Sequence, residues 1–567
     1  MTSNNPFVLP WKVSTSWVPA IVFGLGILLL LPAVWAETSV TGQDEYWLSL
    51  RTPMEMNDHG EWFTPWVNGK PRLQKPPLLY WAILLNYKLF GVHLLSARIW
   101  GVLSGAGLAV CACLFSRELF GRNGLLAGLL ALATMGVAVQ GRQAMLDLPC
   151  ALFSTLAVLC FVKWLKSCSA PGLLPIQTAQ GHLSTILLSA FLLGLSFLTK
   201  GPVGFLFFTA GVLAFLIVFK PGSVLVRNWW QMVLGVVILG AVCLPWPLAM
   251  RHLRPELFSS IMGEELAGRQ FGHWTPGSPL SAWSGALGLV LPWTPLMVAA
   301  IYSHFRRTAL EHLRERRFLL GWFLLAAVPF FFMKSFERYM LALLPAQIVL
   351  CADWLEERQP EARAIVLRIC VLLLAVISLV ICCFAGWFKL ALWEIIICMA
   401  LTGFTVFLAF RSAHPHWVAF CCALLFTVAL GGVYPRFGIN ALPEHLPAEL
   451  AASPVRLFNS PQPSMLSMRL GRSLQLFDAN SPPSATEMVL VDGAHRQQFF
   501  ELLEQRQLQA ADKGDLRTFY SRGAWIRFAR PDATREDWKA AFRARSLEGL
   551  KSEFHYYLVS LKERRLE

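Results

Sequence analysis

Apolar runs of about 18 residues or more recur along the first three quarters of the chain, and each is long enough to cross a membrane as a helix. The 567 residues are 55% hydrophobic and only 15% charged, whereas soluble proteins average about 25% charged residues. The sequence therefore predicts an all-α polytopic membrane protein over residues 1–434.

The apolar runs predict about thirteen spanning helices. Their expected ranges are 17–36, 94–115, 124–140, 148–165, 183–199, 203–219, 229–249, 282–303, 318–333, 339–356, 364–386, 388–409 and 414–433. Residues 78–90 are also apolar but short, and we expect them to form a re-entrant or interfacial helix. The first run also fits a cleaved signal peptide, but it is long enough to span and an uncleaved helix suits the topology below.

Lysine and arginine in the short loops set the expected orientation. If the N-terminus lies inside, every cytoplasmic loop is basic, and the net charge of +14 is explained without a nucleic-acid partner. An odd number of spans then places the tail, residues 435–567, outside. For a bacterial chain this means a multi-pass inner-membrane protein with the tail in the periplasm.

The tail has ordinary polar composition and predicts a soluble α/β domain of about 130 residues. Residues 487–495 indicate a strand and turn, 496–511 an amphipathic helix, and 516–530 paired strands. All thirteen cysteines lie between Cys111 and Cys422, so the tail has no disulfides of its own. We find no catalytic motif in it.

The first outer loop, residues 37–93, opens with the acidic pair Asp44-Glu45 and continues to Lys75. Three tryptophans lie between them, Trp47, Trp62 and Trp66. Tryptophan favours the membrane–water boundary, and a carboxylate and a cation held there suit chemistry on a lipid-linked, anionic substrate. Thr41 and Asp44 also have the spacing of a capping box, so bracing an interfacial helix is an alternative role for Asp44.

Cations also occur in the loops expected outside, against the usual topological bias. In the short loops they are Arg142, Lys200, Lys334 and Arg338, and in the longer loop 250–281 they are Arg251, Arg254 and Arg269. Lys75, Lys200 and the pair Lys334 and Arg338 each stand near the N-terminus of a helix expected to begin at the outer face. Free N–H groups and the helix dipole make such termini anion sites, so several on one face predict a phosphate or pyrophosphate site.

Other roles for these residues remain open. Lys200 and Lys334 also fit side chains that reach anionic lipid headgroups. Asp147 stands two residues before Pro149, where it fits an N-cap. Glu264-Glu265 fit a solvated loop, and His273 is a weak candidate for a metal ligand.

With these residues in view, the chain resembles the outer-face glycosyltransferases that use polyprenyl-phosphate sugars. These are the protein O-mannosyltransferases and, more closely, the bacterial lipid A aminoarabinose transferases of the ArnT type. The matching pieces are Asp44-Glu45, KPPLLYW from Lys75 to Trp81, RQAMLD from Arg142 to Asp147, FLTKGPVG from Phe197 to Gly204, LPW from Leu291 to Trp293, and KSFERYMLALLP from Lys334 to Pro345. The resemblance covers about 17–433 and implies the GT-C architecture with an outer α/β tail.

The resemblance also implies roles for single residues. Asp44 is expected to be the principal catalytic carboxylate and Asp147 a second active-site acid. The expected phosphate-side residues are Lys75, Lys200, Lys334, Arg338 and Tyr339. Further expected substrate-binding residues are Glu45, Tyr80, Arg142 and Arg269.

Two positions depart from the ArnT pattern. Gln74 stands where these enzymes typically have Glu before the lysine, and Leu266 follows Glu265 where they tend to have His. Since those family positions are associated with a divalent metal, the changes speak against one, and the sequence assigns no cofactor. They also weaken the inference that aminoarabinose is the sugar or lipid A the acceptor.

The expected function is transfer of a sugar from an undecaprenyl-phosphate carrier to an acceptor on the periplasmic side, either a lipid A-like glycolipid or a glycoprotein. Two alternatives come from other classes. One is a flippase for a lipid-linked sugar, which predicts an internal repeat that we do not find. The other is a membrane scaffold whose tail binds a partner, which leaves the ordered Asp and Lys motifs unexplained.

Overall fold

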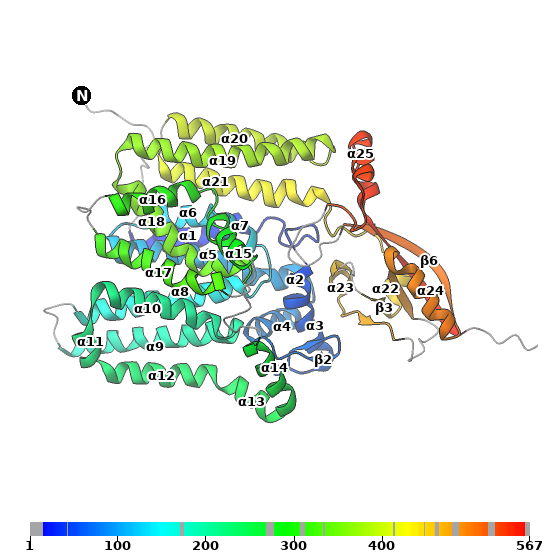
Figure 1. The fold of residues 1–567 in the computed structure, drawn as a ribbon, viewed down its shortest axis with the longest axis horizontal. Helices are drawn as coiled ribbons and strands as arrows, with labels where there is room; N and C mark the ends of the chain where they lie inside the picture. The colour runs from blue at the N-terminus through cyan, green and yellow to red at the C-terminus, as the bar shows by residue number, and fades with distance from the viewer. Residues whose placement is uncertain are drawn as a thin grey trace, which may run out of the picture.

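The structure is a computed structural model, and it describes residues 15–41, 43–169, 175–267, 277–306, 312–332, 335–411, 414–446, 448–459, 464–478, 487–519 and 528–561. Long helices lie side by side in a bundle, and a sheet formed by the end of the chain lies beyond one end of it (Figure 1). The prediction of a mostly helical protein with a small C-terminal sheet domain is confirmed. The boundary at residue 434 stays a prediction.

Eight helices in the described residues are long and apolar enough to cross a membrane. They are α5 (Leu94–Phe120), α8 (Asp147–Ser169), α9 (Pro175–Lys200), α12 with α13 (Trp229–Cys243 and Pro245–Leu253), η3 with α18 (Glu337–Leu343 and Leu344–Glu357), α19 (Pro360–Trp387), α20 (Leu392–Arg411), and α21 with η4 and η5 (Pro415–Val428, Ala429–Val433 and Tyr434–Phe437). Three shorter apolar helices are α1 (Val18–Leu30), α4 (Leu78–Phe90) and α10 (Val203–Phe219). The count of about thirteen spans stays a prediction.

Several of the expected spans are interrupted, among them 124–140 and 282–303. The run 124–140 is split into α6 (Leu125–Leu132) and α7 (Met135–Gln140), because the Thr134 hydroxyl oxygen accepts a hydrogen bond from the Val137 N–H at 3.3 Å and begins a new helix. The run 282–303 is split into α15 (Gly277–Gly288) and α16 (Thr294–Arg306), with Pro292 between them. The remaining elements of the bundle are η1 (Thr15–Trp17), α11 (Gly222–Arg227), α14 (Pro255–Ala267) and α17 (Leu313–Phe332).

Loops that the charge pattern places in the cytoplasm contact one another at one end of the bundle. Arg122 Nε lies 3.2 Å from Glu356 Oε2, and Lys166 Nζ lies 3.1 Å from Glu118 Oε1. The first loop and the C-terminal sheet lie together at the other end (Figure 1). The sorting of loops into two groups therefore agrees with the charge pattern, while the compartment that each end faces stays a prediction.

The first loop folds into short elements that lead from the acidic pair toward Lys75. They are α2 (Gln43–Glu45), the π-helical turn η2 (Tyr46–Leu50), α3 (Arg51–His59), and the two-stranded hairpin β1 (Trp66–Val67) and β2 (Lys70–Pro71). Asn68 and Gly69 form its turn, with φ of 55° and 66°, the left-handed conformation that such two-residue turns require. Their N–H groups donate to the Glu55 carboxylate at 2.9 Å, which fixes the hairpin against α3.

The C-terminal sheet has the order β4-β3-β5-β7-β6. Its elements are α22 (Ala448–Ala452), β3 (Val455–Phe458), α23 (Ser464–Leu470), β4 (Gln475–Leu476), β5 (Met488–Asp492), η6 (Gly493–His495), α24 (Arg496–Gln505), β6 (Leu508–Thr518), α25 (Arg535–Ala544), η7 (Glu548–Leu550) and β7 (Ser552–Leu561). β3 pairs in parallel with β4 and β5, while β7 pairs antiparallel with β5 and β6. Apolar side chains of α24 cover one face, and those of α22 and α23 cover the other.

The predictions for the tail had mixed outcomes. The strand and turn at 487–495 appear as β5 and η6, and the expected helix at 496–511 ends at Gln505. The expectation of paired strands within 516–530 is wrong for the described part of that range. Leu516–Thr518 belong to β6 and pair with β7, and Phe528–Arg530 are not in a strand. Residues 520–527 lie outside the described residues.

Candidate active site

Asp147 lies in a buried ion-pair cluster built from three elements. It is the first residue of α8, Lys200 is the last residue of α9, and Arg338 lies in η3. Lys200 Nζ pairs with Asp147 Oδ1, and Arg338 Nε lies 3.2 Å from Asp147 Oδ2. The side chains of Asp147 and Lys200 are only 4% and 9% exposed. Asp147 therefore lies at the start of a helix, and both of its oxygens contact buried cations. Its role as an N-cap stays a prediction.

Arg338 connects this buried cluster to Asp44 in the first loop. Its Nη2 donates to Asp44 Oδ2 at 3.2 Å. The Asp44 side chain keeps 28% of its surface exposed, which makes it the more accessible of the two acids. The Thr41 hydroxyl donates a hydrogen bond to the Glu45 carboxylate, and the capping role of Asp44 stays a prediction.

Aromatic rings hold the two cations in place. Lys200 Nζ lies 3.7 Å from the centre of the Tyr339 ring, and Arg338 Cζ lies 4.5 Å from the centre of the Phe336 ring. Such contacts are attractive because the face of an aromatic ring is electronegative. A Cβ at Gly285 would lie 2.5 Å from the Glu337 carbonyl oxygen, so glycine lets α15 pack directly against η3.

A cavity of about 160 Å³ opens beside Asp44 and Arg338. Its lining residues are Val40, Thr41, Asp44, Glu45, Val139, Gln140, Gln143, Met145, Leu289, Glu337 and Arg338. Asp147 and Lys200 do not line the cavity, and Arg338 connects them to it. The arrangement can present one carboxylate and one guanidinium to a ligand while a second ion pair supports them from behind.

Glu45 belongs to a second buried ion pair. Its carboxylate receives hydrogen bonds from Arg98 Nε at 2.9 Å, Arg98 Nη2 at 3.0 Å and the Ala144 N–H at 2.8 Å. Glu45 and Arg98 are 1% and 0% exposed. Sequence reasoning missed Arg98, although an arginine inside the apolar run 94–115 is a signal for a buried carboxylate partner. The expected contact of Glu45 with substrate stays a prediction.

The other predicted residues lie at varied distances from the cavity. Lys75 is half-buried just before α4, and the neighbouring Pro76 Cδ lies 4.0 Å from the position that a Cβ on Gly201 would take, so this turn is next to Lys200. Tyr80 is fully buried in α4. Arg142 is also fully buried, and it donates to the carbonyl oxygens of Ala138 at 2.6 Å and Leu29 at 2.7 Å. The roles of Lys75, Tyr80 and Arg142 in substrate binding stay predictions.

Several predicted positions fall outside what the structure describes. Lys334, Arg269 and His273 lie outside the described residues, and the side chains of Glu264 and Glu265 are also outside them. Within the described part of the chain, no group of three or more His, Cys, Asp or Glu side chains is arranged to hold a metal ion. The described carboxylates of the site do not fit a divalent metal, because Arg338 and Lys200 already compensate Asp44 and Asp147.

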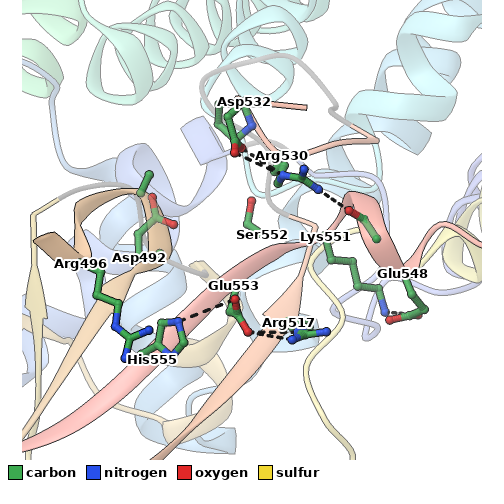
Figure 2. A pocket seen from close by; sticks show the side chains of 14 residues that line it. Asp492, Arg496, Arg517, Arg530, Asp532, Glu548, Lys551, Ser552, Glu553 and His555 are labelled. Carbon is green, nitrogen blue, oxygen red and sulfur yellow. Dashed lines mark hydrogen bonds and ion pairs between the residues drawn. The ribbon is translucent and has the colours of Figure 1, made fainter. Parts of the chain in front are cut away.

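A second cavity of about 470 Å³ lies in the C-terminal sheet domain (Figure 2). Charged side chains of both signs line it, and they pair with one another. Arg517 Nη2 lies 2.9 Å from Glu553 Oε1, Lys551 Nζ lies 2.5 Å from Glu548 Oε1, and Arg530 Nε lies 3.3 Å from Asp532 Oδ1. Because these charges compensate one another, we assign no ligand to this cavity.

The fold and the site together define a polytopic membrane protein with an ion-paired acid and base cluster at one end of its helix bundle. A structure of ArnT from Cupriavidus metallidurans bound to undecaprenyl phosphate shares this fold, with a TM-score of 0.69 and 18% sequence identity, over 88% of this chain and 96% of that one. The family model for dolichyl-phosphate-mannose-protein mannosyltransferase matches residues 19–254. The chain therefore has the fold of ArnT, and its first part is similar to the protein mannosyltransferases.

Two sequence relatives show the same likeness. The undecaprenyl phosphate-alpha-4-amino-4-deoxy-L-arabinose arabinosyl transferase of Yersinia enterocolitica is 27% identical over 426 residues, which are 68% of this chain and 71% of that protein. An uncharacterized protein of Aquifex aeolicus is 26% identical over 341 residues, which are 59% of this chain and 64% of that protein. The match thus spans slightly less than two thirds of the Aquifex protein.

Proposed function

We propose that the protein is a glycosyltransferase that moves a sugar from an undecaprenyl-phosphate carrier to an acceptor on the periplasmic side of the bacterial inner membrane. The acceptor is a lipid A-like glycolipid in this proposal, and a protein is the alternative. The observation that carries it is the contact of Arg338 with both Asp44 and Asp147 beside a cavity. The names of the similar proteins supply the class of donor.

In the proposed reaction, an acceptor oxygen attacks the anomeric carbon of the carrier-linked sugar. A new bond forms between this oxygen and the anomeric carbon, while the bond from the anomeric carbon to the phosphate oxygen breaks. The undecaprenyl phosphate leaves with the bonding electron pair and gains negative charge. In this proposal Arg338, which lines the cavity, stabilises that charge directly, and Lys200 adds positive charge from behind it, a role in which preorganised donors are most effective.

The two carboxylates have different parts in this proposal. Asp44 lines the cavity and is the more exposed, so it accepts the proton when the acceptor is a hydroxyl group. When the acceptor is a phosphate of lipid A, which is already anionic, Asp44 orients it through Arg338 and removes no proton. Asp147 positions Lys200 and Arg338, because both of its oxygens are engaged by these cations.

We also propose that Lys75, Lys334 and Tyr339 lie on the phosphate side of the site. Lys75 lies beside the Lys200 turn and would extend the positive surface toward the carrier lipid. Lys334 and Tyr339 flank Arg338 in the chain, and Tyr339 already supports the Lys200 ammonium through its ring.

Comparative mass spectrometry tests the proposed acceptor. Lipid A and periplasmic glycoproteins from cells with and without the protein should differ by one sugar on lipid A. If the sugar is missing from proteins and lipid A is unchanged, the acceptor is a protein. If neither pool differs, the proposal is contradicted.

Reporter fusions test the proposed orientation. A reporter fused near residue 440 should be active in the periplasm and one near 312 in the cytoplasm, because of the distribution of loop charge.

A further inference from the structure

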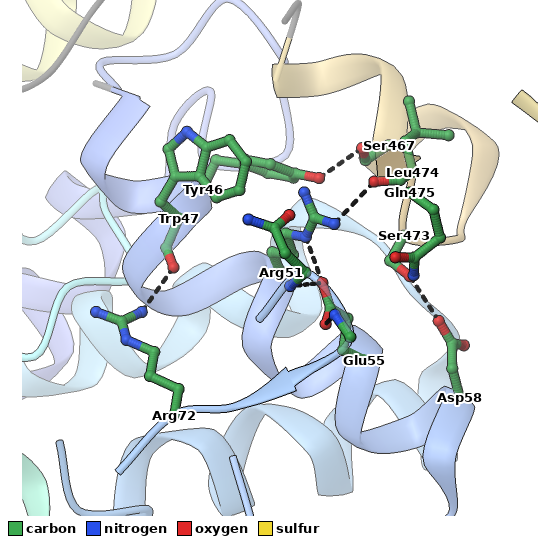
Figure 3. A network of polar contacts seen from close by, with 12 residues as sticks. Tyr46, Trp47, Arg51, Glu55, Asp58, Arg72, Ser467, Ser473, Leu474 and Gln475 are labelled. Atoms are coloured by element: carbon green, nitrogen blue, oxygen red, sulfur yellow. Dashed lines mark hydrogen bonds and ion pairs between the residues drawn. The ribbon is translucent and has the colours of Figure 1, made fainter. Parts of the chain in front are cut away.

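The short helix α23 of the sheet domain contacts both ends of the segment that carries Asp44. At one end, the Tyr46 hydroxyl and Ser467 Oγ form a 2.6 Å hydrogen bond, and both side chains are fully buried (Figure 3). At the other end, Arg469 forms a two-pronged ion pair with Glu37, in which Nη2 lies 2.6 Å from Oε2. The acidic pair of the first loop therefore lies between two attachments to one helix.

Arg469 also fixes α23 to the end of the helix bundle. Its Nη1 donates to the carbonyl oxygen of Pro443 at 3.0 Å, just after the last membrane-length helix. The Arg469 guanidinium thus contacts both Glu37, which precedes the acidic pair, and Pro443, which follows the last long helix of the bundle. Movement of α23 relative to the bundle would have to break these hydrogen bonds together.

The apolar sides of α23 extend the same contact. Met465 and Met468 belong to one buried cluster with Tyr46 and with Leu146, the residue before Asp147. On the other side of the helix, Leu466 belongs to the core of the C-terminal sheet. α23 is therefore packed between the sheet and the two segments that carry the acids of the candidate site.

Contacts after α23 continue along α3. Arg51 Nη2 donates to the Leu474 carbonyl oxygen at 2.8 Å, and Ser473 Oγ donates to Asp58 Oδ2 at 2.8 Å (Figure 3). The part of the first loop from Tyr46 to Asp58 is thus attached to residues 467–474 of the sheet domain. Catalytic groups must be held within about 0.5 Å of their working geometry, and a loop segment gains such precision only from the elements that hold it.

We propose that the C-terminal sheet domain acts as a clamp on the Asp44 segment, with Ser467 and Arg469 as positioning residues for the transfer reaction. The positioning role rests on the proposed function. The attachment itself does not, because it follows from contacts between the two parts of the chain. The clamp keeps the Asp44 carboxylate at Arg338 while donor and acceptor bind.

Charge reversal tests the attachment in the full-length protein in detergent. The variants are Arg469→Glu, Glu37→Arg and the double variant that carries both changes, with hydrogen exchange of the backbone amides in residues 37–50 as the measurement. Each single variant should accelerate exchange there by about tenfold, the effect of losing a charged hydrogen bond. The double variant should restore part of the protection, because the ion pair forms again while the donation to the Pro443 carbonyl oxygen stays lost. Unchanged exchange in both single variants would overturn the proposal.

A second pair of variants covers the case in which charge reversal prevents folding. Ser467→Ala and Tyr46→Phe each remove one side of the buried hydrogen bond, and their effects on exchange should be less than additive when combined. Fully additive effects would overturn this part of the clamp. Arg517→Glu is the matched control, because it breaks an exposed ion pair with Glu553 in the same domain, and it should leave exchange in 37–50 unchanged.

Kinetics separates positioning from simple support of the fold. Arg469→Glu should lower kcat of sugar transfer by about tenfold or more while leaving the affinity for undecaprenyl phosphate within about twofold, and the double variant should recover part of the lost kcat. Faster exchange with wild-type kcat would overturn the positioning role. If the wild-type protein transfers no sugar, the proposed function fails, and the exchange results still decide whether the clamp exists.

Discussion

The guanidinium of Arg338 lies 3.2 Å from the carboxylate of Asp44, although the two residues are 294 positions apart in the chain. The same guanidinium lies 3.2 Å from Asp147 Oδ2. One arginine thus holds an accessible acid of the first loop and a buried acid at the start of α8. The contact with Asp44 is a hydrogen bond from Nη2, and the contact with Asp147 is an ion pair at Nε, so the two acids meet different atoms of one planar guanidinium.

Replacement of Arg338 by lysine tests this geometry. Lys keeps the positive charge but loses the planar fork, so it cannot hold both carboxylates, and turnover should fall by about tenfold or more while the protein still folds. The measurement is sugar transfer together with the thermal midpoint in detergent. Arg436→Lys, at an exposed pair with Glu394, is the control. Wild-type turnover in Arg338→Lys would show that the double contact has no function.

Replacement of Asp147 by asparagine should affect both stability and turnover. It leaves the Lys200 ammonium buried with a neutral partner, and breaking a buried ion pair costs about 3 to 5 kcal/mol. We therefore expect a lower thermal midpoint in detergent as well as slower transfer. If stability stays at the wild-type value, the Lys200 pair does not support the site in this way.

Replacement of Glu45 by glutamine should act mainly on stability. The buried Arg98 guanidinium would lose its charged partner, at a cost of about 3 kcal/mol or more. Glu394→Gln is the matched control, because its pair with Arg436 is largely exposed and such pairs contribute about 0 to 1 kcal/mol. Equal thermal midpoints for the two variants would contradict the importance of the buried pair.

Much of the site is predictable from the sequence. Asp44, Asp147, Lys200 and Arg338 each stand out by their place beside apolar runs, and the structure brings these four together. Lys200 ends α9 and precedes α10, as expected, whereas Arg338 lies within the 3₁₀ segment η3 rather than before a helix. Which acid pairs with which cation depends on contacts between distant segments, and no local pattern encodes it.

Part of the architecture is not predictable from the sequence. α23 has only seven residues, and its contacts with the first loop join positions more than 400 residues apart, so the sequence predicts an independent tail domain instead. The extent of β6 is missed because its partner is β7, whose pairing depends on the folded sheet. The run 124–140 is interrupted at Thr134 because of one local hydrogen bond. The hydrophobicity of the sequence gives no sign of this bond.

Chelation tests the expected absence of a metal requirement. Since Arg338 and Lys200 already compensate the described acids, transfer should survive treatment with EDTA at its original rate. The measurement is product formation before and after chelation and after return of Mg²⁺ or Mn²⁺. Loss of activity with recovery by either ion would contradict this expectation, and it would direct attention to Glu264, Glu265 and His273 as ligands.

The most direct test of the account is sugar transfer by the Asp44→Asn variant, from purified carrier lipid to acceptor in detergent. Asparagine keeps the size of the side chain but removes its charge, so the variant should fold and bind carrier lipid while turnover falls by about 10²-fold or more, the scale of general-base help. Asp532→Asn, at an exposed carboxylate of the sheet domain, should transfer normally. Turnover of Asp44→Asn close to that of the wild type would contradict the account, because Asn caps a helix nearly as well as Asp and Asp44 would then be only structural.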